Sequence, residues 1–138
     1  MGRPRQFDEE RVVESACRVF WAKGYDGAST EDLRIATGLN RSSLYNSFES
    51  KEHLFQLALE QYITRTTTRH NAFLEEPGKS GLERIRTLLD GIVDDEVANQ
   101  AAGTAPGCFT VNTITSIATR DDESPPSSRP TCPNGWPH

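Results

Sequence analysis

The 138-residue sequence predicts an all-α protein with a three-helix head, further helices behind it and a disordered tail. Three observations support this prediction. Apolar residues recur at helical spacing along residues 7–76, capping residues and glycines interrupt that pattern, and five prolines fall within residues 124–138. Because proline removes a backbone donor and clashes with helical backbone, residues 124–138 are predicted to be disordered.

The first helix is predicted to begin at Asp8 and to end near Gly24. Aspartate is a favourable N-cap, and glycine readily adopts the left-handed conformation that ends helices. A buried stripe with i, i+3, i+4, i+7 spacing is formed by Val13, Ala16, Cys17 and Phe20.

Three further caps predict the next helices. Ser29, with Asp32 three residues later, starts a short helix that ends before Gly38. Asn40 then caps a helix of about two turns over residues 41–48, and Ser50 caps a longer one. The apolar residues of this longer helix that are predicted to face the core are Leu54, Phe55, Ala58, Leu59, Tyr62 and Ile63. Residues 82–97 are predicted to form another helix, and the apolar, threonine-rich residues 108–120 follow the loop that ends at Gly107.

Two short helices joined by a tight glycine turn can cross steeply, with one apolar side packed inward. The predicted core positions are Leu33, Leu39, Leu44 and Phe48. The outer polar side consists of Asn40, Arg41, Ser42, Ser43, Tyr45 and Asn46. Arginine pairs with guanine and asparagine with adenine in the DNA major groove, so this side suits DNA recognition. The alternative is a small helical bundle with a solvated polar face.

Three segments resemble the DNA-binding domain of TetR-type transcriptional regulators. They are Thr37-Gly38-Leu39, Leu44-Tyr45-Asn46-Ser47-Phe48 and Ser50-Lys51-Glu52-His53-Leu54. The resemblance covers residues 1–63, and Gly107–Thr113 resembles a helix start in one branch of the family. It implies a repressor that binds a double-stranded DNA operator through the helix at residues 40–47.

The resemblance also implies roles for individual residues. Thr30 and Lys51 would contact phosphate, and Tyr45 would contact phosphate or a thymine methyl group. Arg41, Ser42 and Ser43 would contact the bases or the backbone of DNA. A flexible arm that carries Arg3 and Arg5 would reach into a groove. Alternatively, Ser43 and Asn46 only cap or solvate the helix, and Arg41 and Lys51 are ordinary surface cations.

One position departs from the family pattern. Arg34 lies four residues before Gly38, where the family usually has a small residue at the helix crossing. An arginine there must either turn its side chain outward or push the two helices apart.

The resemblance implies a DNA-binding domain at residues 1–53 and a regulatory domain over residues 54–123 that binds an unknown small-molecule effector. The resemblance stops after Glu123, so we expect a truncated regulatory domain that lacks the helices for homodimer formation. Cys108 is either a small buried residue or a sensor thiol at a helix start. An alternative function is an interaction partner that pairs with a full-length relative and does not bind DNA.

Composition excludes several other classes. Fifteen Lys+Arg against twenty Asp+Glu give a net charge of −5, which argues against wholesale coating of nucleic acid but not against a local basic patch. No apolar run reaches the roughly 18 residues of a membrane span, and no secretory signal is visible, so we expect a cytoplasmic protein. Three scattered cysteines, no metal-ligand spacing and no phosphate loop or nucleophile motif predict no metal, no cofactor and no enzyme activity.

Overall fold

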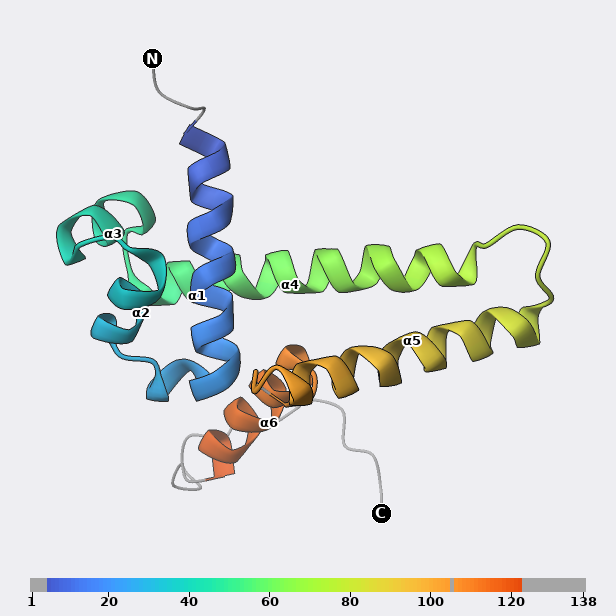
Figure 1. Cartoon of the computed structure of the whole chain (residues 1–138). Helices are drawn as coiled ribbons and strands as arrows, with labels where there is room; N and C mark the ends of the chain where they lie inside the picture. Colours follow the sequence, from blue (N-terminus) through green and yellow to red (C-terminus); the bar gives the residue numbers. More distant parts are fainter. Residues whose placement is uncertain (1–4, 105, 123–138) are drawn as a thin grey trace, which may run out of the picture.

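The computed structural model describes residues 5–104 and 106–122, and these residues form six α-helices and no strand. The helices are α1 (Arg5–Gly27), α2 (Thr30–Thr37), α3 (Arg41–Phe48), α4 (Lys51–Leu74), α5 (Gly81–Ala101) and α6 (Phe109–Asp122). The predicted all-α class is confirmed (Figure 1). The predicted disordered segment, residues 124–138, lies outside the described residues.

The predicted caps start and end the short helices. Asp32 donates its amide to the Ser29 hydroxyl at 3.0 Å, and its carboxylate accepts the Ser29 amide at 3.0 Å, which completes a capping box. Gly38 ends α2 at φ 71°, a left-handed conformation that an L side chain rarely adopts. Ser50 caps α4 by accepting the His53 amide at 3.0 Å.

The predicted start of the first helix is wrong, because α1 begins at Arg5 and not at Asp8. Arginine and glutamine are good helix formers, so residues 5–7 continue the helix upstream without a local penalty. Gly24 adopts φ 70° and ψ 174°, which kinks α1 and leaves a short helical segment up to Gly27. The positive φ predicted for this glycine is confirmed, but its ψ is not that of a left-handed helix cap.

One hydrophobic core joins the three-helix head, which consists of α1, α2 and α3, to the first part of α4 and to α6. Its buried members are Val13, Ala16, Cys17, Phe20, Ala28, Leu33, Leu44, Phe48, Leu54, Ala58, Tyr62 and Phe109. Phe109, the first residue of α6, is 1% exposed. The predicted inward position of Ile63 is wrong, because 41% of this residue is exposed where α4 leaves the head.

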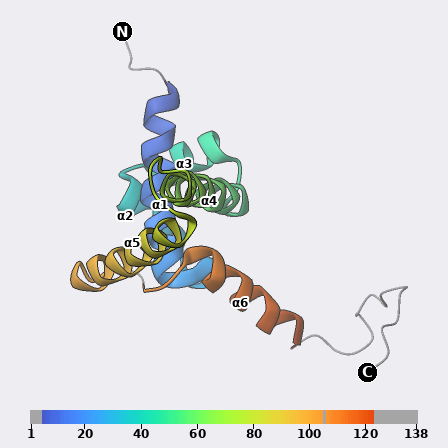
Figure 2. The same ribbon diagram turned by 90° about the vertical axis from the view of Figure 1, so that its right-hand side faces the viewer.

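Beyond the head, α4 extends as a rod and α5 returns along it (Figure 1), while Figure 2 looks down α4 and shows α6 leading away from the crossing. Gly91 lets α5 approach α4 closely, since a Cβ there would lie 3.0 Å from the Phe73 ring. Arg69 and Asp95 join the two helices by an ion pair of 2.7 Å. The opposite face of α5 carries five exposed apolar residues, Leu82, Ile85, Leu89, Val93 and Val97.

None of the helices in the described ranges combines the length and apolar content needed to cross a lipid bilayer.

We expect Phe109→Ala to lower the free energy of unfolding by about 3 kcal/mol or more, because it removes a buried ring and leaves a cavity. Urea unfolding followed by circular dichroism measures this change. The matched control is Ile114→Ala, one turn along α6, where the side chain is 61% exposed. The control should stay within about 0.5 kcal/mol of the wild type. Equal losses in the two variants would show that Phe109 does not anchor α6.

Candidate nucleic-acid interface

The orientation of α3 is fixed by apolar side chains on its inner side. Leu44 and Phe48 are buried against Leu33 of α2, and Leu39 in the turn is partly buried against the same core. The predicted core positions are confirmed. With these contacts made, the other sides of α3 face away from the protein.

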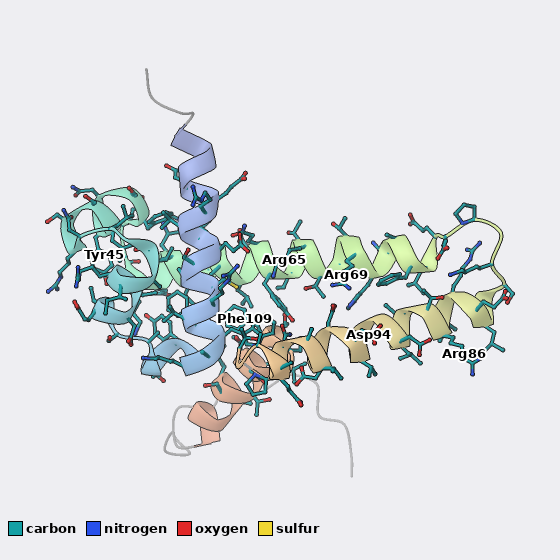
Figure 3. The ribbon with its side chains drawn as sticks, viewed as in Figure 1. Tyr45, Arg65, Arg69, Arg86, Asp94 and Phe109 are labelled. Atoms are coloured by element: carbon teal, nitrogen blue, oxygen red, sulfur yellow. The ribbon has the colours of Figure 1, made fainter. Side chains whose placement is uncertain are left out.

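The outer side of α3 presents polar residues as predicted. Arg41, Ser42 and Asn46 are exposed, and Tyr45 is half-buried. Figure 3 shows Tyr45 at the end of the molecule opposite to Arg86. A period of about 3.6 residues places Ser42, Tyr45 and Asn46 along one side of the helix and Ser43 on another. The helix therefore brings together most of the predicted residues, but Ser43 stands apart from Tyr45.

Thr30 and Tyr45 are joined by a hydrogen bond of 2.9 Å between their hydroxyl groups. The bond braces the start of α2 against α3 and places both hydroxyls together at the edge of the interface. No local pattern predicts this contact, because the two residues lie fifteen positions apart and meet only through the crossing of the helices.

Asn40 caps α3, as predicted, by accepting the Ser43 amide on its side-chain oxygen at 2.7 Å. This bond occupies the carbonyl end of the Asn40 side chain and leaves its NH2 group for another acceptor. The Ser43 backbone is likewise committed to the cap. A contact of either residue with DNA stays a prediction.

Lys51 is the first residue of α4, where backbone N–H groups give the helix end a partial positive charge. Its ammonium lies 4.6 Å from the centre of the Tyr25 ring, which is a cation–π contact. The sequence did not predict this contact, because Tyr25 follows the kink in α1. The ring therefore supports the lysine head group at the start of α4.

Side chains of α2 take part in two ion pairs. Arg34 turns outward and pairs with Glu31 at 2.7 Å, so it does not push the helices apart. The guanidinium hydrogen bond lowers the pKa of Glu31. On the other side of α2, Lys23 contacts the Asp32 carboxylate at 2.6 Å. Hydrogen bonds from Lys23 and then from Ser29 lower the pKa of Asp32 from 3.8 to about 2.

Of the two arginines predicted for the N-terminal arm, Arg3 lies outside the described residues. Arg5 is the first residue of α1, so it belongs to a helix and not to a preceding arm. Their contact with a groove stays a prediction.

Cys108 is half-buried directly before α6. Burial raises the pKa of its thiol, but hydrogen bonds from the Val111 backbone, from Tyr62 and from Thr110 together lower the pKa below its ordinary value. The Tyr62 hydroxyl donates to the Cys108 sulfur at 3.6 Å. In Cys17, by contrast, burial raises the pKa to about 11. The sensor role of Cys108 stays a prediction.

Residues 12–58 match the family model described as bacterial regulatory proteins of the tetR family. The chain is 33% identical over 117 residues to the HTH-type transcriptional repressor ComR of Escherichia coli, covering 85% of this chain and 54% of that protein. It is 32% identical over 123 residues to the uncharacterized HTH-type transcriptional regulator YezE of Bacillus subtilis, covering 89% of this chain and 61% of that protein.

Among solved structures, the chain is similar to a cysteine mutant of the TetR family transcriptional regulator CifR complexed with 26-bp double-strand operator DNA. The TM-score is 0.69 at 33% identity, and the match covers 88% of this chain and 64% of that one. The chain therefore spans between 54% and 64% of the length of these three proteins.

We expect the carboxyl group of Asp32 to titrate with a pKa of about 2 in NMR spectra. Lys23→Met should move that pKa up toward 3.8, because the largest cause of the shift is removed. Since folding lowers this pKa, ionised Asp32 stabilises the fold above about pH 4, and the contribution disappears as pH falls toward 2. Lys79→Met, which removes an ion pair with Glu76 at the far end of α4, is the control and should leave Asp32 unchanged. Titration of Asp32 near 3.8 in the wild type would refute the assigned contact.

Proposed function

This chain belongs to the TetR family of bacterial regulatory proteins, and from that premise we propose that it binds a double-stranded DNA operator and represses transcription. The observation that carries the proposal is the orientation of α3. Leu44 and Phe48 hold its inner side, so that Arg41, Ser42 and Asn46 project outward as a rigid set of hydrogen-bonding groups. Such a helix fits the major groove of DNA.

We assign the polar residues two kinds of contact. Arg41, Ser42 and Asn46 meet base edges, where a good bidentate pair discriminates between bases by about 1–3 kcal/mol. Phosphate contacts come from the Thr30–Tyr45 hydroxyl pair and from Lys51, supported by the N-terminal end of α4. Arg3, Arg5, Asn40 and Ser43 remain candidates for further contacts, with Asn40 and Ser43 also forming the cap.

The proposal includes a division of labour along the chain. Residues 1–53 bind DNA, and residues 54–123 form the regulatory part that receives a small-molecule effector. Helix α4 runs without a break across residues 53 and 54, so it supports a mechanical link between the two parts. As a repressor the protein would act in the cytoplasm, where bacterial DNA lies. The similar proteins are transcription regulators, and we propose no enzymatic role.

The exposed apolar stripe on α5 favours a second candidate function, in which the chain pairs with a longer relative. Light scattering of the chain mixed with such a relative would then report a complex heavier than either protein alone. In that case the chain by itself would not bind duplex DNA. Duplex binding by the isolated chain therefore separates the two candidates.

We expect Arg41→Ala to weaken binding to a selected duplex by about 5- to 150-fold and to relax base preference, because it removes base contacts. Lys51→Ala should weaken binding to all duplexes by the same factor, because it removes one phosphate contact. It should also reduce the slope of log affinity against log salt concentration by about one. The duplex is selected from a random-sequence library with the wild-type chain, and affinities are measured by fluorescence anisotropy.

The matched control is Arg86→Ala, because Arg86 is an exposed cation at the far end of α5 (Figure 3). It should bind the selected duplex like the wild type. If Arg86→Ala and Arg41→Ala weaken binding equally, the affinity comes from general surface charge and the assignment of α3 is wrong.

A further inference from the structure

A cavity of about 630 Å³ opens where α1, α4 and α6 meet, directly behind the head. This volume lies in the range of small-molecule pockets. Five aromatic side chains line it, Phe20, Trp21, Tyr25, Phe55 and Phe109. Figure 3 shows Phe109 at this crossing of the three helices. Phe55 packs 5.1 Å from Phe20 and 5.1 Å from Tyr25 between ring centres, so this part of the wall is built of packed rings.

The polar residues of the lining, whose side chains include both hydrogen-bond acceptors and donors, are Glu52, Gln56, Asn112, Thr113 and Ser116. Glu52 is the one charged residue among the lining residues. Asn112 donates its side-chain NH2 to the Pro106 carbonyl at 3.0 Å, which leaves its side-chain oxygen as the acceptor. The faces of aromatic rings are also negative. Because the one charge in the lining is negative and the ring faces are negative as well, the cavity favours a flat ring system with a neutral or positive charge over an anion.

The ring of Tyr25 belongs to the wall of the cavity and also contacts a residue of the proposed DNA interface. Tyr25 lines the cavity, and the Lys51 ammonium rests 4.6 Å from the centre of the same ring. Tyr25 also packs on Phe55 at 5.1 Å, so a molecule that moves either ring changes the support under Lys51. A positively charged occupant near Tyr25 would in addition repel the lysine head group.

We propose that this cavity binds a planar aromatic amine, and that its occupation weakens DNA binding by displacing Tyr25 and with it Lys51. The inference rests on the proposed function and supplies a site and a chemical class for the effector. Because a ligand can shift DNA affinity only by its differential affinity for the two states, DNA must weaken the binding of the amine by the same factor.

The probes are 2-aminobenzimidazole and 2-aminoquinoline, with benzimidazole-2-carboxylate as the anionic comparator. Binding is measured without DNA by quenching of Trp21 fluorescence in a chain that carries Trp136→Phe, so that Trp21 is its one tryptophan. We expect the amines to bind and the carboxylate to bind at least about fivefold more weakly. Glu52→Gln should weaken binding of the amines by about two- to fivefold, the upper part of the range for an exposed ion pair.

The matched control is Glu60→Gln, which changes an exposed carboxylate on the same helix outside the lining and should not affect the amines. Thermal unfolding verifies that each variant is folded. Equal binding of amines and carboxylate, equal effects of Glu52→Gln and Glu60→Gln, or no binding of either amine would overturn the site.

Coupling is measured with the selected duplex. Saturating 2-aminobenzimidazole should weaken duplex binding by about fivefold or more, and Lys51→Ala should reduce that effect. An undiminished effect in Lys51→Ala would overturn the route through Tyr25. Duplex binding without any amine binding refutes this inference alone, whereas amine binding without duplex binding refutes the proposed function and the coupling but leaves the ligand site in place.

Discussion

The burial of Phe109 is the interaction on which the arrangement of the described helices around the head depends. Its ring packs 5.6 Å from Tyr62, 5.9 Å from Phe55 and 6.4 Å from Trp21, between ring centres. Trp21 also donates its ring N–H to the Gly107 carbonyl at 3.1 Å, which fixes the loop before α6. One residue of α6 is therefore held by both α1 and α4. Closely packed rings transmit displacement, so α6 cannot shift at this end without moving the head.

The head divides its polar groups between two tasks. Ser29, Asp32 and Ser50 cap helix ends through hydrogen bonds made within the protein. Arg41, Ser42 and Asn46 stand outside this network and are exposed. Asn40 belongs to both groups, since it caps α3 and keeps a free donor. Because the caps are separate from most of the outward groups, α3 keeps its shape independently of what those groups contact.

Much of the fold could be predicted because the helices begin and end at residues with strong local preferences. Ser29, Gly38, Asn40 and Ser50 determine α2, α3 and the start of α4 by short-range chemistry. The start of α1 was missed because Asp8 is a good cap that the chain does not use there. The inward prediction for Ile63 is wrong because only one side of α4 is covered at this level, the side that carries the buried Tyr62.

Less of the candidate site than of the fold is encoded in local sequence. Residues facing outward on α3 follow from helical spacing, but the positions of Tyr25 under Lys51 and of Thr30 beside Tyr45 depend on how distant helices cross. No local preference encodes such crossings. For the same reason the aromatic cavity could not be foreseen, since its walls come from α1, α4 and α6. Which groups touch DNA remains a prediction.

The hydrogen bond between the Thr30 and Tyr45 hydroxyls uses only one of their two hydrogens. Two hydroxyls carry two protons and their mutual bond consumes one, so whichever oxygen donates, the pair keeps one hydrogen to offer elsewhere. An approaching anion can be received by reorienting that hydrogen, without dismantling the brace between α2 and α3. The same two oxygen atoms therefore brace α2 against α3 and keep a hydrogen with which they can bind an anion.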